Sequence, residues 1–235
     1  MAIFNLSNHE GLLIYLAQNR AIEKEIEITT TQVANIFSIS QQTASRFLLD
    51  LDKKGLITWK SSPKGSLVQI TPEGVEILYK LRFEIERAIH PDLTTIRIRG
   101  TVFSGLGQGK YYMSRDSYLK EFSDKLGFNP FLGTLNLRIH PNDTDRLDLI
   151  RGSWPIIIPG FEEDERRFGD VLCYALEIPK LSAKVAGIIP RRTHYGSNIL
   201  ELISEVYLRE ALDLEDGDEV IVEFNFDRSK GSENQ

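Results

Sequence analysis

A glycine-rich stretch near the middle of the chain, SGLGQGKYYMS at residues 104–114, has residue types that suit phosphate binding. Gly105, Gly107 and Gly109 precede Lys110, so a permissive backbone and a positive charge lie together. The spacing fits neither common phosphate-binding pattern. A P-loop has four residues between its glycines and Ser or Thr after the lysine, and the dinucleotide fingerprint has its third glycine one residue later. The loop alone therefore leaves its ligand open.

A second set of chemically capable side chains lies in GTLNLRI, residues 133–139, which alternates polar and apolar residues as a β-strand does. The alternation places Thr134, Asn136 and Arg138 on one face and the apolar residues on the other. A hydroxyl and an amide oxygen two residues apart are hard, neutral ligands, which suffice for Mg²⁺ when a nucleotide supplies further oxygens. Taken alone, the pattern is more typical of an ordinary polar strand face.

Polar side chains also cluster in SISQQTASRF, at the start of a predicted helix near the N-terminus. If this helix enters a DNA major groove, its first turns bring five side chains to base edges: Gln41, Gln42, Thr43, Ser45 and Arg46. Lys60 and Lys64, in and beside a hairpin tip, would then contact phosphates. Helices of protein-docking modules have similar polar outer faces, so that alternative stays open.

Capping and turn signals predict the elements that present these residues. Thr29 and Gln32 form a capping box for a helix over 32–37, and Ser40 caps a helix over 41–54. LITWK and LVQIT form a hairpin, and Thr71 with Pro72 begins a helix over 73–89. The expected inward-facing residues of these helices and of a first helix in NHEGLLIYLAQ are Leu12, Leu13, Leu16, Val33, Ile36, Phe37, Ala44, Phe47, Leu48, Leu51, Leu78, Leu81, Ile85 and Ala88. The order predicts a winged helix-turn-helix domain over residues 1–92, and it resembles that of prokaryotic winged-helix repressors.

After Pro91 the chain changes to short strand-like runs separated by glycine and proline turns. The runs are TIRIRGTVFS, GTLNLRIH, PIIIPG, DVLCYALEIP, AKVAGIIP and DEVIVEF. Only RDSYLKEFSDKLG and SEVYLREALD have helical patterns. We therefore predict a small β-barrel with one or two helices over 96–228, a polar tail at 229–235 and, for the whole chain, a two-domain α+β fold.

Composition narrows the range of partners. The net charge of −6 argues against a protein that coats nucleic acid indiscriminately, so DNA contact would need a local patch. No apolar run is long enough for a membrane helix, and we expect a cytoplasmic protein without a membrane partner. Cys173 is the only cysteine, which excludes an internal disulfide, and its apolar neighbours indicate a buried small side chain.

Three blocks in the second part of the chain carry a family resemblance. GTVFSGLGQGKYYMS, LGFNPFLGTLNLRI and IIPRRTHYGSNILELIS, the last followed by LREALDLEDGDEVIV, occur in order over residues 97–225. They resemble the signature blocks of the archaeal CTP-dependent riboflavin kinases. The motif GTLNLRI after GFNPFLG is specific to this family, whereas the glycine loop alone would not identify it. Some members of this family also have an N-terminal winged helix and look like regulators of riboflavin genes.

The resemblance implies a cradle-loop type barrel that makes FMN and CDP from riboflavin and CTP with one Mg²⁺ ion. Thr134 and Asn136 would hold the metal. Thr193 and Glu201 would contact the flavin. Phosphoryl transfer does not require a strong base, and Glu201 is the candidate if the reaction uses one. The nucleotide would be bound by the glycine loop and by a second segment, which together comprise Gly105, Leu106, Gly107, Gln108, Gly109, Lys110, Val206, Tyr207, Leu208 and Arg209.

Three interpretations of the whole chain remain at this point. The first is a kinase that also binds double-stranded DNA as a regulator, possible as a homodimer through the helix over 73–89. The second is a repressor whose barrel has lost catalysis and senses flavin or nucleotide. The third makes the N-terminal domain a protein-docking module. Thr134, Asn136 and the glycine loop favour the first, because a sensor has no need of magnesium ligands.

Overall fold

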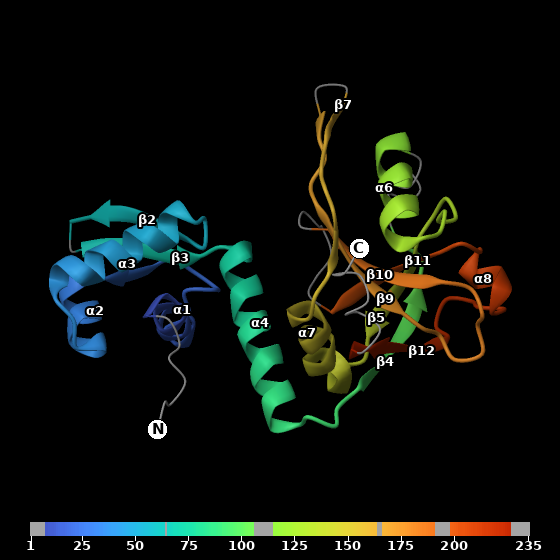
Figure 1. The fold of residues 1–235 in the computed structure, drawn as a ribbon, viewed down its shortest axis with the longest axis horizontal. Coiled ribbons are helices and arrows are strands. Elements are labelled where there is room, and N and C mark those ends of the chain that lie inside the picture. Colours follow the sequence, from blue (N-terminus) through green and yellow to red (C-terminus); the bar gives the residue numbers. More distant parts are fainter. Residues whose placement is uncertain (1–7, 64, 106–114, 164–165, 191–197, 227–235) are drawn as a thin grey trace. The chain divides into compact units, whose positions relative to one another are not determined.

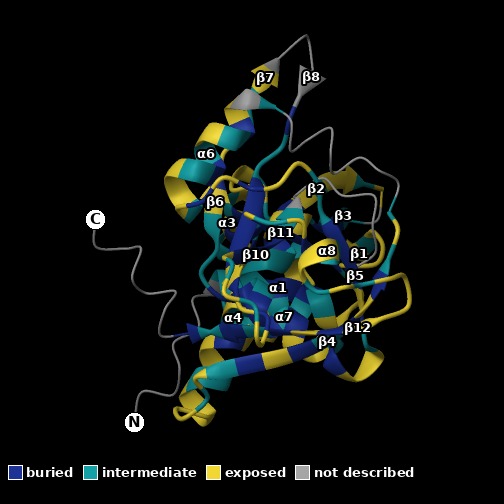
Figure 2. Ribbon diagram, turned by 90° about the vertical axis from the view of Figure 1, so that its right-hand side faces the viewer, coloured by how far each residue is buried: buried dark blue, intermediate teal, exposed yellow. Residues whose placement is uncertain are grey.

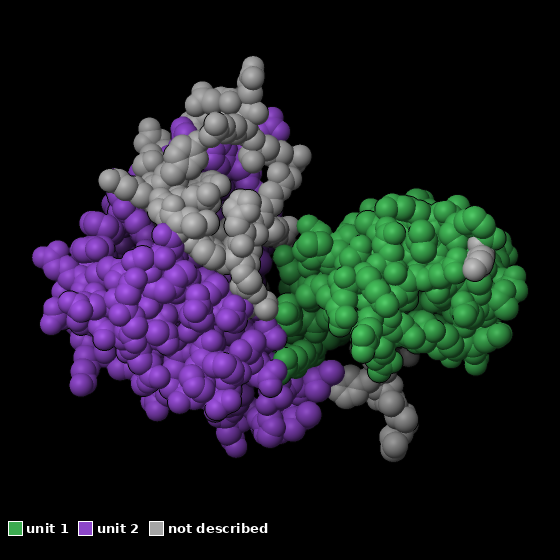
Figure 3. Space-filling view, turned by 180° about the vertical axis from the view of Figure 1, so that it is seen from behind, with its two compact units in different colours: residues 1–84 green, residues 85–235 purple. Residues whose placement is uncertain are grey.

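The computed structural model describes residues 8–63, 65–105, 115–163, 166–190 and 198–226. The chain divides into two compact units, residues 1–84 and 85–235, which are coloured separately in Figure 3. The boundary between the units falls inside one helix, α4, Pro72–Ile89. The predicted division into functional domains at 1–92 and 96–228 stays a prediction.

The first unit combines helices with a small antiparallel sheet (Figure 1). Its elements are α1 Asn8–Gln18, β1 Ile26–Ile28, α2 Thr30–Phe37, α3 Gln41–Lys53, β2 Ile57–Ser62, β3 Gly65–Ile70 and the first part of α4. The sheet has the strand order β1-β3-β2, in which β2 and β3 form the expected hairpin. The short strand β1 is an addition that the sequence patterns did not predict.

Local capping explains where the helices of the first unit begin. The backbone N–H of Gln32 donates to the Thr29 hydroxyl over 3.2 Å, and the Thr29 N–H donates to the Gln32 side-chain oxygen over 2.7 Å. This is the predicted capping box. The hydroxyl of Ser40 accepts from the Thr43 N–H at 3.1 Å at the start of α3. The Thr71 hydroxyl accepts from the Gly74 N–H, also at 3.1 Å, which confirms the predicted start of α4.

The core of the first unit is formed largely by the predicted residues. Three leucines of α1 and four residues of α3 are buried in one cluster: Leu12, Leu13, Leu16, Ala44, Phe47, Leu48 and Leu51. In α2 the expectation for Ile36 is wrong, because its side chain is 47% exposed and Ala34 is buried instead. In α4 the expectation fails at Ile85 and Ala88, which are exposed, whereas Phe83 is buried. Apart from β1, the order of the elements matches the prediction, while the identity of this unit as a winged helix-turn-helix stays a prediction.

The second unit consists of an antiparallel sheet with short helices around it (Figure 1). Its elements after α4 are β4 Thr95–Phe103, α6 Asp116–Leu126, β5 Leu135–Ile139, the 3₁₀ turn η1 Pro141–Asp143, α7 Thr144–Gly152, β6 Ile156–Ile158, β7 Glu162–Glu163, β8 Arg166–Arg167, β9 Val171–Leu176, β10 Val185–Pro190, β11 Ile199–Ser204, α8 Leu208–Ala211 and β12 Glu219–Asn225. The main sheet has the order β12-β4-β5-β11-β10-β9-β6.

The main sheet closes on itself where the end of β9 meets β12. Just after β9, Glu177 exchanges two backbone hydrogen bonds with Glu223 of β12, at 2.9 and 2.8 Å. This mixed α/β unit with a closing antiparallel sheet agrees with the predicted small β-barrel. Along β4 and β12 buried positions alternate with more exposed ones, and Ile98 and Val222 are among the buried residues. In β5 and β9 nearly every position is buried. Figure 2 colours the buried residues dark blue.

Several elements of the second unit were not predicted from the sequence, and the longest of them are α7 and β11. α7 is a helix where none was predicted. Its acidic first turn follows Asp143, which accepts hydrogen bonds from the backbone N–H and the Nε of Arg99 at 3.1 and 2.8 Å, so a tertiary ion pair fixes the start of this helix. β11 is a strand that the sequence analysis did not single out, because its run follows the polar stretch RRTHYGS. Cys173 in β9 is buried, as predicted.

Candidate functional site

β5 pairs with β11 in the main sheet, so the polar residues of β5 lie beside residues of β11. Asn136 is paired in register with Glu201, so their side chains project from the same face of the sheet. Thr134, immediately before β5, has its hydroxyl 3.5 Å from the side-chain oxygen of Asn136. Asn136 is only 8% exposed. Three residues that sequence reasoning proposed for two different roles, metal binding and flavin contact, are therefore one cluster.

Glu201 is not at a sheet edge, because β11 lies between β5 and β10. Its side chain is half-buried. Burial raises the pKa of this carboxyl, and a hydrogen bond with Thr134 partly offsets the effect. A carboxyl with a raised pKa is better suited to accept a proton near neutral pH than an ordinary surface glutamate is.

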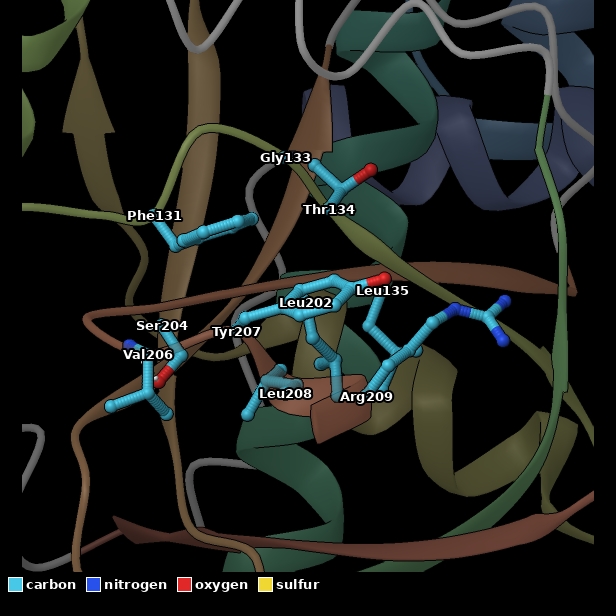
Figure 4. A pocket seen from close by; sticks show the side chains of 10 residues that line it. All are labelled: Phe131, Gly133, Thr134, Leu135, Leu202, Ser204, Val206, Tyr207, Leu208 and Arg209. Atoms are coloured by element: carbon cyan, nitrogen blue, oxygen red, sulfur yellow. Dashed lines mark hydrogen bonds between the residues drawn. The ribbon is translucent and has the colours of Figure 1, made fainter. Parts of the chain in front are cut away.

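A pocket opens beside this cluster, between the start of β5 and the segment that follows β11 (Figure 4). Its lining comes from two stretches of chain and from Leu202: Phe131, Gly133, Thr134 and Leu135 on one side, and Ser204, Val206, Tyr207, Leu208 and Arg209 on the other. The rings of Phe131 and Tyr207 stack with centroids 4.9 Å apart, and both are more than 40% exposed. The structure thus brings residues 206–209 to Thr134, as the predicted site requires.

The pocket is connected to the start of the glycine loop through one carboxylate. Asp216 Oδ1 accepts from Arg209 Nη2 at 2.6 Å, and its Oδ2 accepts from the backbone N–H of Ser104 at 2.9 Å. Ser104 immediately precedes Gly105. The remaining predicted loop residues lie outside the described residues, and they are Leu106, Gly107, Gln108, Gly109 and Lys110. Thr193, predicted to contact the flavin, and Lys64, predicted to contact DNA, also lie outside them.

Sequence reasoning missed two residues that the geometry places at the site, Phe131 and Asp216. Phe131 belongs to the GFNPFLG turn, which is part of the family resemblance. The aromatic ring of Phe131 was assigned no role from the sequence. Asp216 belongs to LEDGDE, which lies within the last family block but received no role of its own. Its partners are 7 and 112 residues away in the chain, so no local pattern pointed to the second of them.

The donor set at β5 is compatible with magnesium when a phosphate completes it. Within the described ranges no group of three or more His, Cys, Asp or Glu side chains could hold a metal ion. The oxygens of Thr134 and Asn136 are neutral and adjacent, and Glu201 adds a carboxyl next to them. Mg²⁺ accepts such hard oxygens and usually takes further ones from water and nucleotide phosphates.

The residues predicted to contact DNA lie on α3 and the hairpin of the first unit. Gln41, Gln42 and Arg46 are exposed, whereas Thr43 and Ser45 are half-buried. The side-chain amide of Gln41 donates to the Thr31 hydroxyl at 3.0 Å, which ties α3 to α2. Lys60 pairs with Glu25 at 2.8 Å, and this hydrogen bond raises the lysine pKa. A phosphate would therefore compete with Glu25 for Lys60.

Comparison with known proteins decides the family. The model CTP-dep_RFKase, described as a domain of unknown function, DUF120, matches residues 102–224. The riboflavin kinase of Archaeoglobus fulgidus is 42% identical over 225 residues, which cover 91% of this chain and 94% of that protein. The chain belongs to the family of CTP-dependent riboflavin kinases.

Other riboflavin kinases are similar over a comparable extent. The riboflavin kinase of Pyrococcus furiosus is 42% identical over 89% of this chain and 94% of its own length. The riboflavin kinase of Methanosarcina barkeri is 36% identical over 94% of this chain and 96% of its own length. The similarity therefore extends beyond the residues that the family model matches. The predicted enzyme class, a riboflavin phosphotransferase, is confirmed. Among the helices described here, none is both long and apolar enough to cross a membrane.

Proposed function

We propose that the second unit transfers the γ-phosphoryl group of CTP to the ribityl 5′-hydroxyl of riboflavin, giving FMN and CDP. The observation that carries this proposal is the convergence of Thr134, Asn136 and Glu201 with the pocket formed by residues 206–209. A phosphoryl acceptor, its base and a nucleotide would then share one face of the sheet. Phosphoryl transfer proceeds through a loose transition state, so it depends mainly on positioning and charge neutralisation.

The nucleotide would occupy the pocket and the adjoining loop. Arg209, whose side chain is 22% exposed beside the pocket, would contact phosphate oxygens through its guanidinium. The stacked rings of Phe131 and Tyr207 provide an exposed aromatic surface on which a planar base can lie. Residues 105–110 would bind the phosphates through backbone N–H groups, as the family resemblance implies.

Thr134 and Asn136 would hold Mg²⁺ through their side-chain oxygens. The ion, when bound with the nucleotide, supplies neutralisation of phosphate charge. Glu201 accepts the proton of the attacking 5′-hydroxyl in this scheme, and its raised pKa suits that task. Its place opposite Asn136 in the register supports an arrangement in which the acceptor hydroxyl would lie beside the phosphates.

The test is to incubate the purified protein with riboflavin, Mg²⁺ and CTP and to separate the flavins and nucleotides by chromatography. The proposal predicts FMN and CDP in equal amounts. Folded protein that binds both substrates and forms neither product would contradict it and favour the flavin-sensing or nucleotide-sensing alternative.

We infer a second function, sequence-specific binding of double-stranded DNA by residues 1–92. The favouring observation is that Gln41, Gln42 and Arg46 are exposed in the first turns of a helix whose start is fixed by Ser40. Gln can pair with adenine and Arg with guanine in a major groove. Regulation of riboflavin genes and a homodimer through α4 belong to the same proposal.

The DNA function is tested with duplexes selected for binding from a random-sequence pool. Arg46→Ala should weaken binding to the selected site by about 1 to 3 kcal/mol, the cost of losing one base-reading arginine. Lys53→Ala, at the other end of α3, is the matched control, because it removes the same charge from an exposed position outside the predicted reading turns. Equal, small effects of both variants would instead support a protein-docking module.

A further inference from the structure

The turn between α8 and β12, residues 214–218, holds one carboxylate between two parts of the chain that are far apart in sequence. Asp216 accepts from Arg209 with one oxygen, at 2.6 Å, and from the Ser104 backbone N–H with the other, at 2.9 Å. Arg209 lines the pocket, and Ser104 is the residue before the glycine loop. Among the described residues, Asp216 thus connects the two predicted nucleotide-binding segments, residues 206–209 and the start of the glycine loop.

The turn itself is held firmly to the end of β4. Val102 donates its N–H to Asp218 at 2.8 Å and accepts from the Gly217 N–H at 2.9 Å. The side chain of Asp218 accepts from the Glu215 N–H at 2.7 Å and closes the turn. Gly217 has a φ of 101°, which favours glycine over any other residue. These three hydrogen bonds fix the backbone that presents Asp216.

Global stability does not explain this arrangement well. The Asp216 side chain is 50% exposed, and ion pairs with that much solvent contribute little to folding. The geometry does explain an orienting role. A guanidinium has five N–H donors. Among the described residues, the Arg209 guanidinium donates one hydrogen bond, to Asp216, and the other four donors can serve phosphate oxygens. The pKa of Asp216 is lowered, first by Arg209 and then by Ser104, so the carboxylate remains charged where its partners need an acceptor.

We propose that Asp216 is a positioning residue for the nucleotide, which holds Arg209 and the entry of the glycine loop in the relative placement that one CTP molecule requires. It does not touch the substrate itself. A carboxylate facing a triphosphate directly would repel it, whereas one already paired with Arg209 and Ser104 orders the donors instead. This role rests on the proposed kinase function and adds a residue to it.

The first test replaces Asp216 by asparagine, which keeps the shape but has an NH₂ group in place of one of the two acceptor oxygens. Asp216→Asn should raise KM for CTP, and the dissociation constant of CDP measured by calorimetry without riboflavin, by about tenfold or more. KM for riboflavin should change less than twofold. Glu215→Gln is the matched control, because it removes the same charge from the neighbouring exposed residue and should leave both constants unchanged.

A double-mutant cycle separates positioning from a general structural effect. If Asp216 acts by orienting Arg209, the CDP affinity lost through Asp216→Asn should shrink markedly in an Arg209→Ala background. Additive losses would overturn the proposal, and so would unchanged CDP affinity in Asp216→Asn. Should Asp216→Asn fold poorly, Asp216→Glu serves as the second variant. It keeps the charge and should bind CDP more tightly than Asp216→Ala does, whereas equal affinities would overturn the proposal.

These outcomes are distinct from a failure of the kinase proposal. Wild-type protein that binds CDP and makes FMN while Asp216→Asn behaves identically would remove only the positioning role. Wild-type protein that makes no FMN would remove the kinase activity, and CDP calorimetry would still report whether Asp216 orders a nucleotide site.

Discussion

At the scale of single residues, the proposed chemistry depends on three side chains that cross-strand pairing brings together. Thr134 and Asn136 offer neutral oxygens, and Glu201 offers a carboxyl whose pKa is raised by burial. Neutral ligands bind a divalent cation weakly by themselves, so metal and nucleotide should bind together. A site of this kind differs from a structural metal site, which binds its ion without a substrate.

Asn136→Ala should lower the turnover number at least tenfold, equivalent to about 1.4 kcal/mol of barrier, because it removes one of two proposed metal oxygens. The Mg²⁺ concentration for half-maximal rate should rise as well. Rates measured across a magnesium titration provide the check. The control is Asn142→Ala, an exposed asparagine of η1. A variant with the wild-type magnesium curve would exclude Asn136 from the metal site.

Glu201→Gln should lower the turnover number by about a hundredfold if the carboxylate is the base. In the wild type the rate should fall as pH drops through the raised pKa of Glu201, because only the ionised form accepts a proton. The acidic limb of the pH–rate profile should therefore disappear in Glu201→Gln. A limb that persists at the same pH in the variant would assign it to another group.

The same pKa shift predicts the sign of a stability change. A carboxyl whose folded-state pKa is raised favours folding below its unfolded pKa, and this contribution is lost as pH rises through the folded value. Glu201→Gln removes the burial of a charge and should melt at a higher temperature than wild type at neutral pH. The difference should vanish below about pH 4, where the wild-type carboxyl is protonated in both states. A lower melting temperature at neutral pH would contradict this assignment.

At the scale of elements, the proposed site lies on β5, a central strand of the main sheet between β4 and β11. Close packing at this strand requires Gly100 of β4, where an added Cβ atom would lie 2.8 Å from the Cβ of Leu137. Gly100→Ala should therefore destabilise the protein by about 1 to 3 kcal/mol through overpacking. Gly133→Ala is the control for the melt, since its Cβ would have no neighbour nearer than 3.6 Å. Equal melting temperatures would show that the strands can move apart without cost.

Elements with strong local signals were predictable from the sequence. The capping box of α2, the Ser40 cap of α3 and the alternation of β5 lie within a few residues, and the structure has these elements at the predicted places. α7 and β11 were missed, because Asp143 is fixed by Arg99 from another strand and β11 depends on pairing with β5 and β10. For the same reason the meeting of Asn136 with Glu201, and of Asp216 with Ser104, could not be read from spacing.

At the scale of the whole molecule, the chain has two compact units with their own cores, and each has a separate proposed activity. Family membership supports the kinase activity directly, whereas DNA binding rests on the exposed residues of α3. The net charge of −6 fits a nucleic-acid contact that is confined to a patch. Variants of α3 should therefore leave FMN formation unchanged.

The central claim is that one site on the second unit phosphorylates riboflavin with a cytidine nucleotide. Initial rates of FMN formation with CTP and with ATP, measured in parallel on the wild type and on Asn136→Ala, test it most directly. The account predicts rapid formation of FMN with CTP, little with ATP, and a loss of at least about tenfold in the variant. Equal rates with both nucleotides, or a variant as fast as the wild type, would contradict it.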